Sequence, residues 1–88
     1  MAWTVSYTET ARQQLKKLDR QTARRIVAYL DERIAPLEDA RSAGKPLTGP
    51  LGSFWRYRIG DYRILCDLQD DSLVILVVAV GNRREVYR

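Results

Sequence analysis

The stretch Phe54–Leu68 decides the fold, and it reads FWRYRIGDYRILCDL. Aromatic and β-branched residues flank the dipeptide Gly60-Asp61, and a glycine at the first position of a two-residue turn is typical of a β-hairpin. Because such a turn fixes the register of its strands, the residues that face each other can be counted outward from it. The sequence therefore predicts two antiparallel strands with known cross-strand partners.

The predicted register separates the side chains of this hairpin onto two faces. One face carries the mainly apolar pairs Ile59–Tyr62, Tyr57–Ile64 and Trp55–Cys66. The other face carries the pairs Arg58–Arg63, Arg56–Leu65 and Phe54–Asp67. Two directly opposed arginines destabilise a sheet unless an anion lies over them. We interpret the second face as an open, phosphate-binding surface; a structural network in which Asp61 or Asp67 neutralises the arginines is the alternative.

The composition predicts one small folded domain over residues 1–88, with 45% hydrophobic and 30% charged residues. A net charge of +4 and a pI near 9.6 favour an acidic partner such as nucleic acid. The chain contains no histidine, which excludes histidine acid–base chemistry and removes the commonest zinc ligand. The single cysteine, Cys66, is predicted to be core packing.

We expect neither a targeting segment nor a membrane span in this chain. Met1 is followed by neither the basic nor the apolar segment that begins a signal peptide, and the longest apolar run, Leu73–Val80, is too short to cross a bilayer. A lone cysteine also suits a reducing compartment. We therefore expect a cytoplasmic protein with no membrane partner.

The remaining sequence predicts a strand, a helical hairpin and a loop before the central hairpin. Residues 3–7 alternate as a strand does, and Thr8 or Thr10 is the candidate N-cap of the helix that follows, with Thr10 and Gln13 matching a capping box. Asp19 is the predicted N-cap of a second helix that ends near Pro36. Residues 40–53 are rich in glycine and proline and predict a loop.

A last strand over Leu73–Val80, apolar on both faces, is predicted at the centre of the sheet. The predicted order is βααβββ, an α+β fold in which the helical hairpin packs on one face of an antiparallel sheet. If residues 69–72 form a four-residue turn, the pairs are Leu68–Leu73, Cys66–Ile75, Ile64–Val77 and Arg63–Val78. Arg83 then lies within roughly 17 Å of Arg63 even if extended, so the tail can join the arginine face.

Over essentially its whole length the chain resembles toxins of the RelE/ParE superfamily, and the RelE branch in particular. The resemblance is carried by GKPLTG at 44–49, WRYRIGDYR at 55–63 and VGNRREVYR at 80–88. Together, the core Arg-x-Gly-Asp-Tyr-Arg and the ending Gly-x-Arg-x-x-x-Tyr are specific. The resemblance implies a toxin that forms a hetero-oligomer with a small RelB-like antitoxin.

RelE-type toxins are ribosome-dependent mRNA endoribonucleases that need no metal or other cofactor, so the resemblance implies mRNA on the ribosome, and rRNA, as partners. By position it assigns catalytic roles to Arg63, Arg83 and Tyr87. It assigns RNA contacts to Arg56 and Arg58, and Lys45 is a further candidate. Asn82 stands where relatives often carry lysine or histidine. This departure keeps open a non-catalytic member that only binds an antitoxin, and a ParE-like inhibitor of DNA gyrase with the same fold is the other alternative.

Arginine suits one part of RNA cleavage and not the others. Its planar fork binds phosphate oxygens, but it does not release its proton near neutral pH. Deprotonation of the 2′-hydroxyl and protonation of the leaving oxygen need another group. Tyr87 is our choice for proton transfer, with Glu85 and Asp67 as weaker candidates. A site so poor in acids and bases depends on a larger assembly to orient its substrate.

Two further groups of residues have a structural and a functional interpretation. The aromatic residues Trp3, Trp55, Tyr57 and Tyr62 can stack nucleobases or fill the core. The predicted register favours the core for Trp55, Tyr57 and Tyr62. A basic run on the predicted helical hairpin is a solvated face, or else an antitoxin or rRNA contact; it comprises Lys16, Lys17, Arg24 and Arg25.

Overall fold

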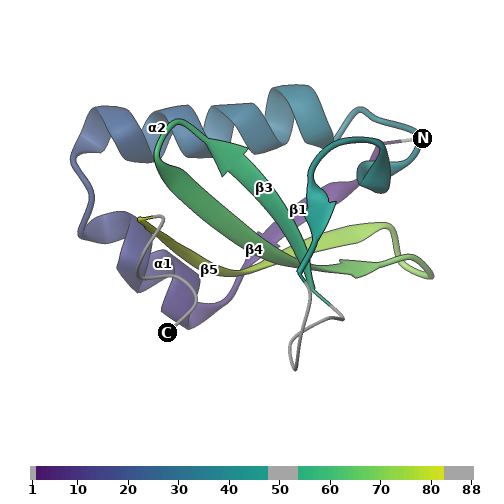
Figure 1. Cartoon of the computed structure of the whole chain (residues 1–88). Helices are drawn as coiled ribbons and strands as arrows, with labels where there is room; N and C mark the ends of the chain where they lie inside the picture. The colour runs from purple at the N-terminus through teal and green to yellow at the C-terminus, as the bar shows by residue number, and fades with distance from the viewer. Residues whose placement is uncertain (1, 48–53, 83–88) are drawn as a thin grey trace.

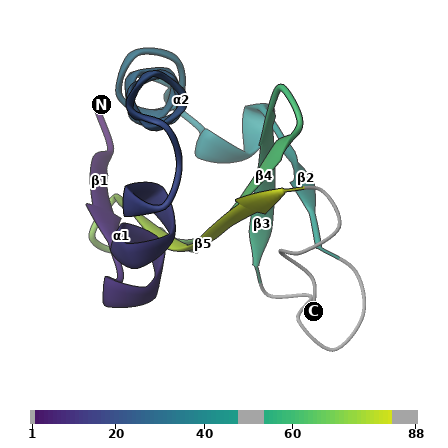
Figure 2. The ribbon, with the colours of Figure 1, turned by 90° about the vertical axis from the view of Figure 1, so that its left-hand side faces the viewer.

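The computed structural model describes residues 2–47 and 54–82. In these ranges a five-stranded sheet carries two helices on one face (Figures 1 and 2). The elements are β1 (Thr4–Tyr7), α1 (Glu9–Lys16), α2 (Arg20–Tyr29), the π-helical turn η1 (Leu30–Ile34), the 3₁₀ turn η2 (Ala40–Ser42), β2 (Lys45–Pro46), β3 (Trp55–Ile59), β4 (Tyr62–Gln69) and β5 (Val74–Asn82). Neither helix is long and apolar enough to cross a membrane, nor is any other in the described ranges.

The sheet order is β1-β5-β4-β3-β2, which confirms the α+β class and the central position of the last strand. The prediction of a wholly antiparallel sheet is wrong in one pair, because β1 runs parallel to β5. The chain reaches β5 only after both helices and three strands, so no hairpin turn fixes the relative direction of these two strands. The short strand β2 was also not expected, since it lies within the predicted loop of residues 40–53.

The register of the β3–β4 hairpin is confirmed. All five pairs from Ile59–Tyr62 outward to Trp55–Cys66 have the predicted partners, including Arg58 opposite Arg63. The sixth expected pair, Phe54–Asp67, lies beyond the end of this ladder. Gly60 has φ +59°, the left-handed conformation that a glycine adopts without strain.

The predicted register of the β4–β5 hairpin is wrong. The turn lies one residue later than expected, so that Gln69 faces Val74 and Leu68 faces Ile75. A β-bulge between Leu65 and Cys66 then adds another residue of offset. The observed partners are Val77 for Cys66, Val80 for Ile64 and Gly81 for Arg63.

Capping residues set the start of both helices. The Thr8 side chain accepts a hydrogen bond from the Ala11 N–H, and Asp19 accepts one from the Thr22 N–H. Asp19 was the predicted cap; of the two candidates for the first helix, Thr8 is the cap and Thr10 is not. The second helix continues through η1 and ends before Pro36, as expected.

The core lies between the helices and the sheet. Ile26, Leu30 and Ile34 contribute the helical side of this core, each no more than 1% exposed. From the sheet, Tyr57, Ile64 and Cys66 are fully buried, as the predicted faces required. The burial of Cys66 in this core confirms that it is a packing residue, and burial also raises the pKa of its thiol.

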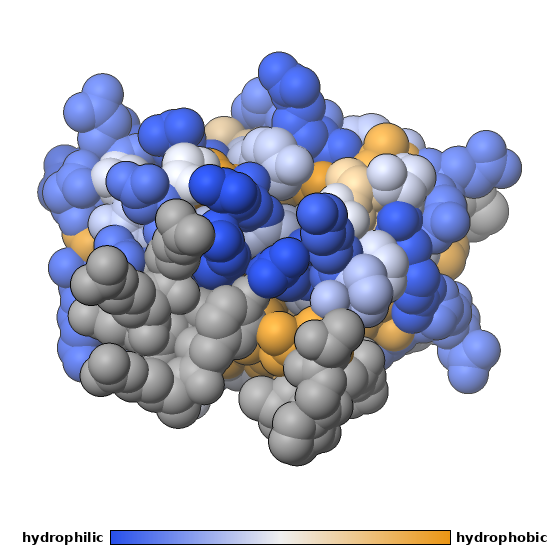
Figure 3. Space-filling model, viewed as in Figure 1, coloured by the Kyte–Doolittle hydropathy of each residue, from blue (hydrophilic) through white to orange (hydrophobic). Residues whose placement is uncertain are grey.

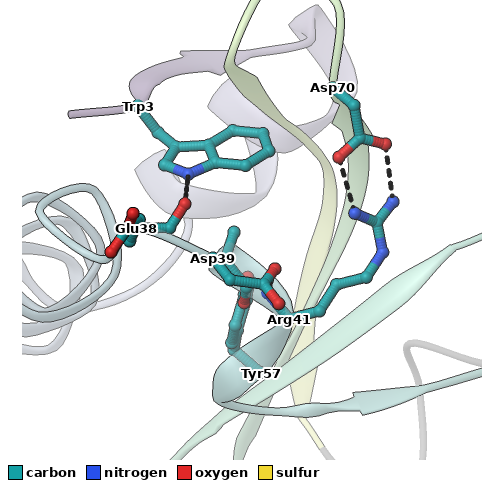
Figure 4. Close-up of polar contacts among 7 residues, drawn as sticks. Trp3, Glu38, Asp39, Arg41, Tyr57 and Asp70 are labelled. Carbon is teal, nitrogen blue, oxygen red and sulfur yellow. Dashed lines mark hydrogen bonds and ion pairs between the residues drawn. The ribbon is translucent and has the colours of Figure 1, made fainter. Parts of the chain in front are cut away.

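Four side chains hold the connector of residues 36–44 against the sheet, and Figure 4 shows three of them. The Tyr57 hydroxyl donates to the Ala40 carbonyl oxygen at 2.7 Å, and Trp55 Nε1 donates to the Ala43 carbonyl oxygen at 2.7 Å. Trp3 Nε1 reaches the carbonyl oxygen of Glu38 at 3.5 Å. The guanidinium of Arg41 binds both carboxylate oxygens of Asp70. These contacts position Gly44 and β2 beside the edge of β3.

Candidate functional site

A small cavity at the edge of the sheet brings together four of the predicted site residues. Its volume is about 230 Å³, and its lining consists of Tyr29, Gly44, Lys45, Arg56, Arg58 and Arg63. Lys45, Arg56, Arg58 and Arg63 were all expected to contact RNA or to act in catalysis. The other two predicted catalytic residues, Arg83 and Tyr87, lie outside the described residues.

Strand pairing positions the basic side chains. Arg56 and Arg58 lie two residues apart on β3 and therefore project from the same face of the sheet. Lys45 of β2 is the partner of Arg56, and Arg63 of β4 is the partner of Arg58. Three neighbouring strands thus each contribute to the cavity. Among the residues that Figure 3 colours by hydropathy, hydrophilic ones predominate on the side of the molecule that faces the viewer in Figure 1.

Arg63 is enclosed, which corrects the expectation that it lies on an open face. Only 8% of the residue is exposed, although the register places it on the predicted side of the sheet. Arg63 lies on β4, between β3 and β5, so strands flank it on both sides, whereas Arg58 lies nearer the edge of the sheet. Two of its guanidinium nitrogens, Nε and Nη1, are buried without a hydrogen-bond partner. A buried arginine is rarely left unpaired, so this geometry favours a bound anion.

The alternative of a neutralising carboxylate network is not observed in the described ranges. There, neither Asp61 nor Asp67 forms an ion pair with Arg58 or Arg63, and the carboxylate of Asp70 pairs with Arg41 instead. Arg58 is exposed, so solvent weakens its repulsion with Arg63. An anion supplied by a binding partner would neutralise these opposed arginines.

None of the buried phenol or thiol groups with raised pKa values lines this cavity. Desolvation raises the pKa of Tyr7 to about 12 and raises that of Tyr57 as well. These groups stay protonated at neutral pH and cannot act as bases there. Within residues 2–47 and 54–82, no three His, Cys, Asp or Glu side chains lie close enough together to share a metal ion.

Sequence reasoning assigned no role to two of the lining residues, Tyr29 and Gly44. Tyr29 is the last residue of α2 and lies next to the buried Leu30, and no motif in the sequence singled it out. Gly44 belongs to the GKPLTG motif but lay in a segment predicted to be a loop. The glycine itself was the only signal in the sequence, and the structure gives it a φ of +77°, which glycine adopts freely.

Comparison with known proteins identifies the class to which this fold and site belong. The family described as ParE toxin of the type II toxin-antitoxin system, parDE, matches residues 5–87. Toxin RelG of Mycobacterium tuberculosis (strain ATCC 25618 / H37Rv) is 33% identical over 90 residues, which cover 100% of this chain and 99% of that toxin. The chain therefore belongs to the RelE/ParE superfamily of type II toxins.

Solved structures agree with this membership. The toxin–antitoxin complex RelBE2 from Mycobacterium tuberculosis contains a chain that is 27% identical, with a TM-score of 0.85 over 97% of this chain and 95% of that chain. The isolated E. coli RelE toxin shares the fold, with a TM-score of 0.71 and 22% identity over 98% of this chain and 92% of that one. These relatives place the protein in the RelE-like branch.

Proposed function

We propose that this toxin is a ribosome-dependent, metal-independent mRNA endoribonuclease that stops translation. The observation that carries the proposal is the cavity in which Arg63 is 8% exposed with two unpartnered guanidinium nitrogens beside Arg58. Arginine clusters of this kind recognise phosphate, because each fork supplies charged donors to its oxygens. The resemblance of the chain to RelE toxins supports RNA as the substrate and the ribosome as the place of cleavage.

In this proposal the arginines stabilise the pentacoordinate phosphate of the reaction. Arg63 donates to the scissile phosphate, and its enclosure strengthens this interaction because solvent screens it less. Arg56, Arg58 and Lys45 bind neighbouring phosphates and set the path of the RNA. Arg83 and Tyr87 take their roles from the family resemblance, with Tyr87 transferring a proton. The ribosome supplies the in-line orientation of the 2′-hydroxyl.

The experiment that tests the proposal is mapping of transcript 5′ ends after brief induction of the toxin. We expect new ends within translated frames, and we expect them to disappear when translation is blocked first. Arg63→Met should abolish them, while Arg12→Met, which changes an exposed arginine of α1 outside the cavity, should not. Intact messages in growth-arrested cells would contradict the proposal.

A second candidate function is inhibition of DNA gyrase, as in ParE-like toxins. The match of residues 5–87 to the ParE toxin family favours it. It requires no phosphate site, however, and the unpartnered Arg63 favours cleavage instead. The same induction experiment separates the two functions, since a gyrase inhibitor arrests replication and leaves messages intact. A non-catalytic member would do neither.

We also propose a RelB-like antitoxin as the partner that neutralises this protein. Related folds occur in toxin–antitoxin complexes from Mycobacterium tuberculosis, E. coli and Pyrococcus horikoshii. An apolar groove between α1 and α2, of about 730 Å³, offers a surface for an amphipathic helix, and its rim includes Lys16, Arg20 and Arg24. Asp31 and Glu32 also line the groove, so a matching partner helix would carry acidic residues opposite the cations and basic ones opposite these two carboxylates. Co-expression with the neighbouring small reading frame should restore growth and yield a co-purifying complex.

A further inference from the structure

One side of the cavity is lined by an aromatic residue that the proposed ribonuclease mechanism does not use. Tyr29 lines it together with four basic residues and Gly44. The tyrosine packs partly against the hydrophobic core and is neither fully buried nor fully exposed. One part of the residue therefore anchors it, while another part borders the space beside the arginines.

The position of Tyr29 is fixed from both directions along its helix. Ile26, one turn earlier, and Leu30, the next residue, are both 0% exposed. Core packing of this density leaves the backbone at Tyr29 little freedom to move. A wall of this kind is formed before any ligand arrives, so binding to it costs little conformational entropy.

Another part of the cavity lining is bare backbone. At Gly44 a Cβ atom would lie 2.4 Å from the Arg56 carbonyl oxygen and 2.7 Å from Trp55 Nε1, so no side chain fits there. The β2–β3 ladder also contains only two pairs, Lys45–Arg56 and Pro46–Trp55. In the described ranges, therefore, β3 has no strand partner on this side at Arg58. A flat group can approach the cavity along this edge.

The combination of cations and one aromatic ring selects the chemistry of the occupant. Sites for single-stranded nucleic acid pair a basic groove for the phosphates with aromatic side chains on which bases stack. A volume of about 230 Å³ is large enough for a phosphate and part of one nucleotide. Resting on the proposed ribonuclease function, we infer that Tyr29 is a platform for one unpaired nucleobase of the bound RNA, next to the phosphate held by Arg58 and Arg63.

The test separates base contacts from phosphate contacts. The binding of a 2′-O-methyl RNA trinucleotide, which cannot be cleaved, is measured against that of an abasic analogue with the same phosphates. Tyr29→Leu should weaken binding of the trinucleotide about tenfold, equivalent to about 1.4 kcal/mol, and leave binding of the analogue unchanged. Tyr29→Phe should bind both as the parent does. Arg58→Ala should weaken both.

Matched measurements keep the inference open to contradiction. Tyr62→Leu, which removes a similarly half-buried tyrosine that lines a different pocket, should bind both ligands as the parent does. If Tyr29→Leu does not fold, the ring resonances of Tyr29 in the parent protein should shift with the trinucleotide and not with the abasic analogue.

The inference is overturned if Tyr29→Leu binds the trinucleotide as tightly as the parent. It is also overturned if this variant loses both ligands equally, if Tyr29→Phe behaves like Tyr29→Leu, or if the parent binds neither ligand. Because these are binding measurements, they are independent of transcript cleavage. A protein that stacks a base but cuts no message would therefore contradict the proposed function and not this inference.

Discussion

The two faces of the β3–β4 hairpin both bury a polar side chain, but they differ in how that side chain is satisfied. On the face beneath the helices, Tyr57 is 0% exposed and its hydroxyl donates to the Ala40 carbonyl oxygen. On the opposite face, Arg63 is 8% exposed and two of its nitrogens have no partner. A satisfied buried group adds to stability, whereas an unsatisfied one detracts from it. The first face therefore serves folding, and we propose that the second face binds the ligand.

The largest effect is expected from truncation on the folding face. Tyr57→Ala removes a fully buried aromatic ring together with the bond that holds the connector of residues 36–44. We expect a loss of about 3–5 kcal/mol in the free energy of unfolding, as for other buried aromatic residues. Urea denaturation followed by circular dichroism measures this. A loss below about 1 kcal/mol would show that the face contributes little to the core.

Removal of charge on the ligand face should affect activity instead of folding. Arg63→Met keeps an unbranched side chain in the enclosed space and deletes the unpartnered guanidinium, so the free energy of unfolding should stay the same or rise. Cleavage of ribosome-bound message should fall by about 10²–10³, the usual effect of losing one electrostatic donor to the transition state. Single-turnover cleavage on purified ribosomes measures it.

Arg63→Ala is a less clean test than its predicted open position suggested. Because the residue is 8% exposed, truncation to alanine leaves a space that the surrounding side chains must fill. That loss opposes the gain from relieving repulsion with Arg58, a term of a few tenths of a kcal/mol to about 1 kcal/mol. If the Arg63→Met protein does not fold, or if it cleaves message as fast as the parent, the proposed division into a folding face and a ligand face is wrong.

The sequence predicted one hairpin well because its turn is local. Gly60-Asp61 determines all five pairs of β3 with β4, and with them the cross-strand contact of Arg58 and Arg63. The next hairpin was misplaced because its geometry depends on Leu73, which adopts φ +54°, and on a bulge after Leu65. Leucine gives no signal for a left-handed conformation, which Gly, Asn and Asp favour, and a bulge leaves no fixed mark in the sequence.

The candidate site was predicted in part, for a related physical reason. Strand alternation brings Arg56, Arg58 and Arg63 to one face, and this follows from local geometry alone. The burial of Arg63 and the position of Tyr29 beside it depend on packing between elements that are distant in the sequence. The local periodicity of a strand or a helix therefore predicts neither. The same holds for the parallel pairing of β1 with β5.

A comparison of two buried hydroxyls sharpens the distinction between satisfied and unsatisfied groups. Tyr57→Phe leaves the Ala40 carbonyl without its donor and should lower the free energy of unfolding by about 1–3 kcal/mol. The Tyr7 hydroxyl is buried without a partner, so Tyr7→Phe should be neutral or stabilising by up to about 1 kcal/mol. Equal losses in the two variants would contradict this account.

The same pair predicts a pH dependence. Burial and the charge of Asp31 raise the pKa of Tyr7 to about 12, above its ordinary value of about 10. The folded state therefore favours the neutral phenol. The stability contribution is complete below pH 10 and is lost as the pH rises through 12. The free energy of unfolding of Tyr7→Phe should therefore fall less steeply between pH 10 and pH 12 than that of the parent. If the two proteins show the same dependence of stability on pH, Tyr7 does not titrate in this interval.

The smallest effect is expected from an exposed charge on the ligand face. Arg58 lines the cavity but is open to solvent, so we expect it to contribute to the proposed RNA binding mainly by neutralising phosphate. Each such contact to a single strand adds about −0.7 to the slope of log K against log salt. Arg58→Ala should therefore flatten that slope by about 0.7 without changing the free energy of unfolding by more than about 0.5 kcal/mol.

Arg12→Ala provides the control, since its arginine is exposed on α1, outside the cavity. Equal slopes for the parent and both variants would mean that RNA does not follow the arginine face, whereas a flattened slope for Arg58→Ala alone would place the phosphate backbone along β3.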